Sequence, residues 1–382
     1  MKVCSVTRSN AVLAPVSLAL AMTLGLGASS ASAGGTIKID DTKWVSVGAG
    51  LRTSFNAVED AAASGKDYSK DFQLDSIRLY INGQIHKNIK LTFNTERQDK
   101  GGGDDDIRTL DAIAQFEFNP NFNVWAGRFL PPSDRINLDG PYYLSSWNFP
   151  LVQTYPSIFA GRDDGAAVWG DTSFGETQFK YQVGAFQGCA DSGSCNTGAN
   201  DEDNLLYAGR FTLNFWDPEP GYYNSSTYYG GKDILSLGLV LQSQSDAVGT
   251  VANQKDFFGW NLDGLMEKKL SNDGVVTLEG AYYDFDLDNA SPVNSGGLVE
   301  GTSYFLQAGY LFPQHIAIGQ FQPYLQVSNL DPDNGGETDK WEAGLNYIID
   351  GHNARVSAVF GNTDPDNAND TNFFQLGIQL QI

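Results

Sequence analysis

Cationic side chains recur at positions that alternate with apolar residues along the chain. Arg52, Arg78 and Arg210 each lie on the polar side of such an alternating run. A guanidinium group is planar and permanently charged, and its fork of N–H donors matches the oxygens of a phosphate. Rings of arginine and lysine are the side chains that select anions and phosphate in pores. The same alternation predicts further cations on this face: Arg128, Lys180 and Arg355, with Lys90 close to a turn.

Carboxylates occupy the same predicted face and oppose this charge. The cations lie mostly in the first half of the chain and the carboxylates mostly in the second half, which predicts a transverse field across an enclosed space. The alternative is that the two sets of charges pair with each other and leave that space unselective. The predicted inward carboxylates are Asp111, Glu117, Asp263, Glu267, Glu279 and Glu342.

The sequence contains none of the common catalytic motifs. GxSxG, HExxH and the phosphate-cradling P-loop are all missing. The three histidines, His86, His315 and His352, fall in predicted turns. We therefore expect neither an enzyme nor a metal or cofactor site.

Alternation of apolar and polar residues with a period of two runs along almost the whole chain and predicts β-strands. Near the end, for example, Phe374, Leu376 and Ile378 alternate with Gln375 and Gly377. The spacing of an amphipathic helix hardly occurs. The predicted strands are 43–57, 73–86, 88–98, 107–118, 122–129, 165–172, 177–187, 204–216, 233–245, 256–269, 274–286, 303–312, 320–330, 339–349, 353–362 and 371–382.

Short and long connections alternate between these 16 segments. Outer-membrane barrels have this arrangement, with short periplasmic turns and longer external loops. The predicted fold is therefore all-β, a 16-stranded antiparallel transmembrane β-barrel. One predicted turn, residues 217–232, is unusually long, and we expect Lys232 within it to lie away from the pore.

The longest connection follows the fifth segment and contains Arg135 and Arg162 among several aspartates. An irregular segment of this length is uncommon unless it is functional. As the third external loop, it is expected to fold inward and to narrow the lumen of the barrel.

The first residues have the features of a cleaved secretory signal. Lys2 and Arg8 precede an apolar run that ends in small residues, and cleavage is expected after Ala33. We expect residues 1–33 to be removed and residues 34–382 to form the barrel domain, exported through the periplasm to the outer membrane of a Gram-negative bacterium. The formal net charge of −22 argues against nucleic acid as a partner.

Two cysteines remain after the signal, Cys189 and Cys195, with five residues between them. In an exported protein this spacing predicts a disulfide that closes one loop. A metal site would need more ligands than this loop offers.

The run AGRFLPPSD at residues 126–134, together with the strand pattern and the long insert, resembles the phosphate-selective porin O/P family. In that family a strand with a similar ending leads into the constriction loop, and arginines line the pore. A homotrimer is usual for porins of this size. The resemblance implies a constriction formed by Arg128, Arg135 and Arg162 and a pore wall that includes Arg52, Arg78 and Arg210.

The expected function is passive diffusion of small hydrophilic solutes through an outer-membrane porin, with a modest preference for anions such as phosphate. Two alternatives stay open. One is a general or weakly cation-preferring porin, and the other is a structural or adhesive outer-membrane protein whose acidic loops bind cations. The expected partners are outer-membrane lipid, lipopolysaccharide, the solutes and further copies of the chain.

Overall fold

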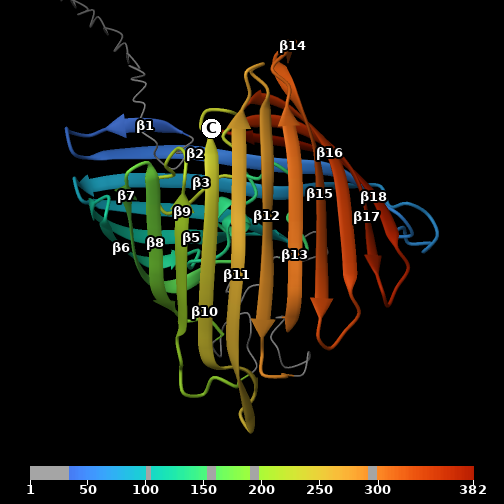
Figure 1. Ribbon diagram of the computed structural model, residues 1–382, viewed down its shortest axis with the longest axis horizontal. Helices are drawn as coiled ribbons and strands as arrows, with labels where there is room; N and C mark the ends of the chain where they lie inside the picture. Colours follow the sequence, from blue (N-terminus) through green and yellow to red (C-terminus); the bar gives the residue numbers. More distant parts are fainter. Residues whose placement is uncertain (1–33, 100–104, 153–160, 190–197, 291–298) are drawn as a thin grey trace, which may run out of the picture.

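The computed structural model describes residues 34–99, 105–152, 161–189, 198–290 and 299–382. Its strands belong to one 18-stranded sheet, in which 16 strands form a closed antiparallel barrel (Figure 1). The ring closes where β18 (Thr371–Gln381) pairs with β2 (Trp44–Val58). Two short strands lie outside the ring: β1 (Gly35–Lys38) pairs with β2, and β14 (His315–Ile316) pairs with β15.

The other strands of the ring follow one another in chain order. The first of them are β3 (Asp71–His86), β4 (Ile89–Asp99), β5 (Asp105–Asn119), β6 (Phe122–Phe129), β7 (Asp163–Phe174), β8 (Thr177–Phe186) and β9 (Leu206–Asn214). The rest are β10 (Ile234–Thr250), β11 (Asn253–Lys269), β12 (Val275–Asp286), β13 (Gly301–Leu311), β15 (Gly319–Pro332), β16 (Thr338–Asp350) and β17 (Ala354–Pro365).

Side-chain alternation explains why the sheet closes with its apolar face outward. On β18, Leu376, Ile378 and Leu380 are 44–49% exposed, whereas Gln379 is fully buried inside. Successive residues of a strand point to opposite faces, so the apolar set faces the surroundings and the amide set faces the lumen. This polarity is the reverse of a soluble barrel and is typical of a transmembrane one.

The two ends of the barrel differ in their connections. At one end, called here the short-turn end, residues 87–88, 120–121, 175–176 and 351–353 are tight links between strands. The opposite end, called the long-loop end, carries connections such as residues 59–70 and the insert between β6 and β7. Among the described residues, no helix has the length and apolar character to cross a membrane.

One connection differs from the length that the sequence predicts, and another is long as predicted. β10 and β11 extend further than expected and leave only residues 251–252 as their turn, so the expected loop is a protruding hairpin (Figure 1). The β9–β10 loop, residues 215–233, belongs to the short-turn end but is long. Several of its side chains, such as Glu219 and Tyr222, lie inside the barrel.

Candidate functional site

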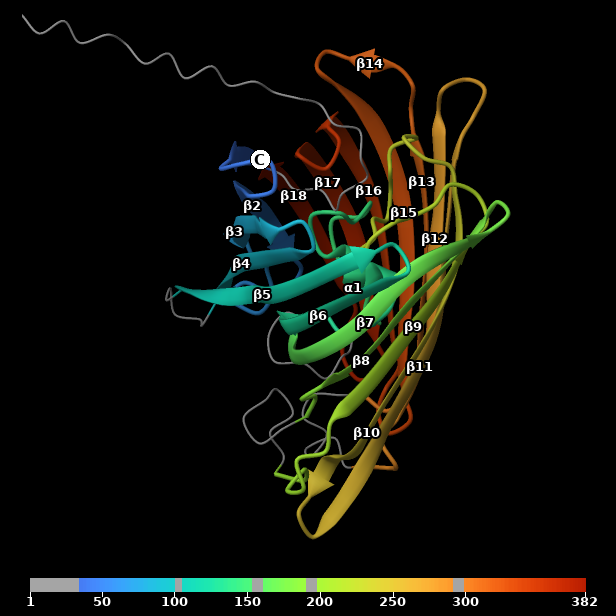
Figure 2. The same ribbon diagram turned by 90° about the vertical axis from the view of Figure 1, so that its left-hand side faces the viewer.

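The insert between β6 and β7 lies against the inner face of the barrel. It contains the short helix α1 (Arg135–Asp139; Figure 2). All five residues of this helix are buried. The Trp147 amide donates to the hydroxyl of Tyr324 on β15 over 3.0 Å. Asn346 on β16 donates to the Ser145 carbonyl over 2.7 Å. These contacts with distant strands place the described part of the insert across the lumen.

The start of α1 is fixed by a carboxylate cap. Asp134 accepts a hydrogen bond from the amide of Asn137 over 3.0 Å, as an N-cap residue does. The hydroxyl of Tyr283, on β12, donates to the same carboxylate over 3.0 Å. Burial, together with the nearby charge of Asp263, raises the pKa of Asp134 to about 6. The capping carboxylate of Asp134 therefore holds the helix to the wall and lies close to the carboxylate of Asp263.

The β9–β10 loop enters the same space from the short-turn end. Tyr222 stacks on Trp125 of β6, with ring centroids 4.7 Å apart, and its hydroxyl donates to the Leu130 carbonyl over 2.9 Å. Ser226 donates to Asp139 of α1 over 2.8 Å. The loop is thus bound both to the wall and to the insert.

A buried ion pair joins the two internal segments. Arg135 of the insert donates through both terminal nitrogens to the carboxylate of Glu219 in the β9–β10 loop, and both side chains are 1% exposed. Although burial acts to raise it, the pKa of Glu219 is held at about 2 by the charge of Arg135. Bidentate pairs of this kind fix orientation as well as distance. The two segments therefore form one internal body.

This internal body packs closely on one side of the barrel. The wall formed by β9, β10 and β11, called here the packed wall, buries Leu206, Val248 and Phe257 in one apolar cluster with Leu138 of the insert and Tyr222 of the loop. Its inward polar groups are covered as well. The described residues are thus densely packed along the packed wall.

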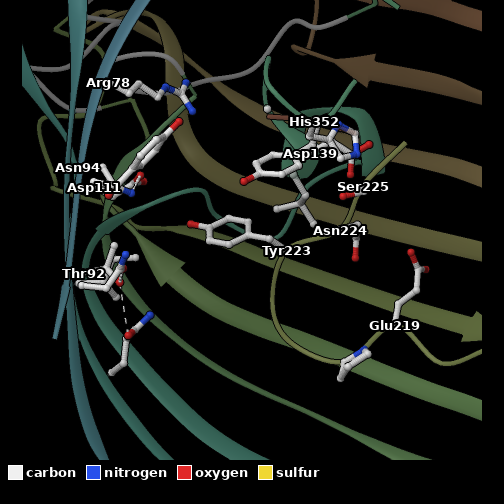
Figure 3. Close-up of a pocket in the computed structure, with 18 of the residues that line it drawn as sticks. Arg78, Thr92, Asn94, Asp111, Asp139, Glu219, Tyr223, Asn224, Ser225 and His352 are labelled. Carbon is white, nitrogen blue, oxygen red and sulfur yellow. Dashed lines mark hydrogen bonds between the residues drawn. The ribbon is translucent and has the colours of Figure 1, made fainter. Parts of the chain in front are cut away.

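A cavity of about 560 Å³ lies on the other side of the internal body. Strands β3, β4 and β5, called here the cavity wall, line it with Arg78, Asn94 and Asp111 (Figure 3). The facing side is formed by the β9–β10 loop, including Tyr223 and Asn224. The cavity is therefore bounded by strand residues on one side and by the internal body on the other.

The charges that line the cavity balance in sign. Within the cavity wall, Lys90 bonds Glu117 over 2.5 Å. Between the wall and the insert, Arg162 bonds Asp111 over 3.0 Å. The cationic lining residues are Arg78, Lys90, Arg162 and Lys232, and the carboxylates are Asp111, Glu117, Asp139 and Glu219.

The six arginines that the sequence predicts to line the pore occupy different environments in the structure. Arg78 and Arg162 line the cavity. Arg135 and Arg210 are buried in the internal body and the packed wall, where Arg210 pairs with Asp263 and donates to the Ser133 carbonyl over 3.2 Å. Because a fully buried side chain cannot contact a passing solute, these arginines hold the internal body in place.

Arg52 also supports the insert rather than lining the cavity. Its guanidinium group lies 4.0 Å from the ring centre of Trp147 and donates to the Trp147 carbonyl over 2.7 Å. Arg355 donates to the carbonyls of Leu144 and Ser146 over 2.7 and 3.1 Å. Both arginines face inward and are covered by the insert.

The expected inward position of Arg128 is wrong. Arg128 pairs in register with Ala112, an exposed residue of β5, and residues paired across an antiparallel ladder share a face. On β6 the side chains of Trp125 and Phe129 face inward. Because successive side chains of a strand point to opposite faces, Arg128, which precedes Phe129, faces outward. There its guanidinium group bonds Asp164 over 2.7 and 2.8 Å.

Several residues of the site were not predicted from the sequence. Glu219 and Tyr223 lie in a segment interpreted as a turn, and Lys232, expected to lie away from the pore, lines the cavity. His352 occupies a short turn as expected, but its ring nitrogens Nδ1 and Nε2 lie 3.1 and 2.9 Å from the carbonyl oxygens of Tyr142 and Thr227. A neutral ring donates to one of these two carbonyls, and it contacts both internal segments. The available signal was the unusual length and aromatic content of residues 217–232.

The predicted disulfide lies partly outside the described residues. Cys189 is buried and disulfide-bonded. Its expected partner, Cys195, is not among the residues that the structure describes, so that pairing stays a prediction. Within the described ranges, no cluster of histidine, cysteine and carboxylate side chains could hold a metal ion.

Comparison with known proteins identifies the fold. No family model matches the chain, and neither does any curated protein. OmpT of Vibrio cholerae, as a loop L8 deletion mutant, is 14% identical with a TM-score of 0.54, over 90% of this chain and 100% of that one. An anion-selective porin from Comamonas acidovorans is 12% identical with a TM-score of 0.56, over 89% and 100% of the two chains.

A third similar structure is the outer-membrane channel DcaP of Acinetobacter baumannii. It is 11% identical with a TM-score of 0.55, over 91% of this chain and 99% of that one. At such identities the likeness concerns the fold alone. The chain therefore has the fold of Gram-negative outer-membrane porins and channels.

Proposed function

We propose that the chain forms a passive channel in the outer membrane of a Gram-negative bacterium, through which small hydrophilic solutes diffuse. The observation that supports this most is the combination of an apolar outer face with an internal cavity of about 560 Å³ that is lined in part by charged and polar side chains. An open polar path through an apolar layer is what passive diffusion requires. We expect no enzymatic activity.

A modest preference for small anions such as phosphate is the finer part of the proposal. Arg78 and Arg162 in the cavity support it, as does the fold shared with an anion-selective porin. Their carboxylate partners, Glu96 and Asp111, reduce the field that an anion would meet. We therefore expect weak selectivity, without a dedicated phosphate site at the buried arginines.

The assembly and surroundings are also part of the proposal. A homotrimer is supported by the trimer form in which OmpT of Vibrio cholerae has been described, a structure with a TM-score of 0.53 to this chain. Outer-membrane lipid and lipopolysaccharide would contact exposed apolar side chains such as Leu237, Leu306 and Leu325. We also propose that residues 1–33 are removed during export.

The test is a planar-bilayer recording of the full mature chain under a gradient of potassium chloride. The proposal predicts step-like conductance with a small reversal potential on the anion side. Preference for potassium over chloride would overturn the anion part and leave the channel. A folded barrel without step-like conductance would overturn the channel and favour a structural or adhesive role.

A further inference from the structure

Six polar side-chain atoms around the cavity have no hydrogen-bond partner among the described residues. They are the hydroxyls of Tyr80, Tyr223 and Tyr229, the amide oxygen Oδ1 of Asn94, the carboxylate oxygen Oδ1 of Asp139 and the amide nitrogen Nδ2 of Asn224. All six side chains line the cavity. Buried polar groups are normally paired, so their occurrence around one space indicates a ligand with complementary groups.

The orientations of the two amides are set by charged neighbours. Asn94 donates through Nδ2 to the carboxylate of Asp111 over 2.8 Å, which leaves its oxygen as the free acceptor. Asn224 accepts through Oδ1 from the ammonium group of Lys180 over 3.2 Å, which leaves its nitrogen as the free donor. The free atoms are therefore two acceptors, on Asn94 and Asp139, one donor on Asn224, and three tyrosine hydroxyls that can serve as either.

This mixed set distinguishes between classes of solute. An anion such as phosphate can accept a hydrogen bond from Asn224 but cannot donate one to the oxygen of Asn94. A metal cation can bind the oxygen of Asn94 but cannot accept a hydrogen bond from Asn224. A hydroxyl group both donates and accepts. A solute with several hydroxyl groups can therefore satisfy all the free atoms at once.

Aromatic rings add an apolar component on both sides of the cavity. Tyr80 belongs to the cavity wall and Trp44 to the neighbouring strand β2. Tyr143 belongs to the insert, and Tyr223 and Tyr228 belong to the β9–β10 loop. Figure 3 shows Tyr223 extending towards the side that carries Asn94 and Asp111. Aromatic faces with a few convergent polar groups are the usual lining of small-molecule sites, and the volume lies within their range of about 300–1,000 Å³.

The paired charges favour a neutral ligand. Arg78 is bonded to Glu96 over 2.7 Å, and Lys90 and Arg162 have carboxylate partners of their own. A charged solute would have to compete with these pairs, whereas a neutral one leaves them intact. We propose that the cavity is a binding site for neutral, ring-shaped polyhydroxylated solutes of the carbohydrate class, held between the cavity wall and the β9–β10 loop.

This inference rests on the proposed channel function, and single-channel recording separates the two. With the full mature chain, a neutral disaccharide should reduce the ion current along a saturating curve. A polyethylene glycol of equal hydrodynamic radius should produce only the non-saturating decrease expected from slower ion diffusion. Comparison of these two solutes needs no mutant.

Variants locate the site. Asn94→Leu and Asn224→Leu should each weaken the disaccharide block about tenfold, the effect of losing roughly 1.4 kcal/mol of binding. Asn272→Leu is the matched control, because Asn272 lies in an exposed turn and bonds Tyr310, away from the cavity. Its block should equal that of the parent chain. Heat-dependent mobility of the barrel on a gel checks that each variant is folded.

The other outcomes overturn the inference. Identical, non-saturating effects of sugar and polyethylene glycol on a conducting channel would reject the carbohydrate site and leave the channel function intact. Saturating block by inorganic phosphate but not by the disaccharide would assign the cavity to anions instead. A folded barrel that does not conduct would reject both the site and the channel.

Discussion

The cavity wall and the packed wall both carry inward arginine–carboxylate pairs, Arg78–Glu96 on the first and Arg210–Asp263 on the second. Only the first pair has a member that lines the cavity. The second is covered by the insert, whose Ser133 carbonyl accepts from Arg210. An inward charge therefore takes part in permeation only where the internal body leaves it uncovered.

The two walls also differ in what their charges do. On the packed wall, Asp263 accepts from the backbone amide of Arg135 over 3.1 Å and so holds α1 in place. On the cavity wall, Lys90 and Glu117 pair with each other, and their side chains are 34% and 22% exposed. Packed-wall charges should thus affect stability, and cavity-wall charges should affect selectivity.

The largest effect on stability is expected for the ion pair inside the internal body. Arg135→Met leaves the carboxylate of Glu219 buried without its cation, and breaking a buried pair in this way costs about 3–5 kcal/mol. We expect the free energy of unfolding, measured by denaturant titration, to fall by this amount. We also expect the conductance to rise and fluctuate, because the ion pair that connects the insert to the β9–β10 loop is lost.

Lys268→Met is the control for this change. It removes an ion pair with Asp233 whose side chains are 45% and 33% exposed, and such pairs contribute about 0.2–1 kcal/mol. Its channel should conduct like the parent. Equal losses of stability in the two variants would mean that the Arg135–Glu219 pair does not join the internal segments.

An intermediate effect is expected on the cavity wall. Lys90→Met leaves Glu117 unpaired and should shift the reversal potential towards cations, whereas Glu117→Gln leaves Lys90 and should shift it towards anions. A partly exposed charge contributes about 0.5–1 kcal/mol, which is roughly a two- to fivefold change in the permeability ratio. Reversal potentials in a salt gradient measure both shifts.

Arg128→Gln provides the contrast for these two variants. Arg128 bonds Asp164 on the outer face, so its loss should leave the reversal potential unchanged. A shift as large as that of Lys90→Met would place Arg128 in the path of the ions after all.

The smallest expected effect concerns pH and His352. Burial lowers the pKa of His352 to about 4 from 6.5. Between these values the unfolded chain takes up a proton that the folded chain does not, so stability falls as the pH decreases from about 6.5 to about 4. Denaturant titrations at pH 7 and pH 4.5 should show this loss, and His352→Gln should reduce it. An identical pH dependence in the variant would exclude His352 as a cause.

Most of the fold could be predicted from the local alternation of apolar and polar residues, because the residues of each strand specify its two faces. The fifth predicted strand, 122–129, coincides with β6 (Phe122–Phe129). The face of Arg128 was missed, since a single residue of register decides it and the charge of an arginine does not.

The internal body could not be predicted in the same way. Arg135 and Glu219 are 84 residues apart, and no local pattern links them. Insertion of the β9–β10 loop into the lumen depends on contacts such as the stacking of Tyr222 on Trp125. Its length and tyrosines were visible in the sequence, but they specify no partner.

Thiol modification during single-channel recording tests most directly whether solutes pass along the cavity wall. Thr92 lines the cavity on β4, whereas Thr277 on β12 faces inward but is 2% exposed and donates to Glu267 over 3.1 Å. A charged methanethiosulfonate reagent should reduce the current of Thr92→Cys in a lasting step and leave the parent chain and Thr277→Cys unchanged. Reduction of the current in Thr277→Cys, with Thr92→Cys unaffected, would contradict the account.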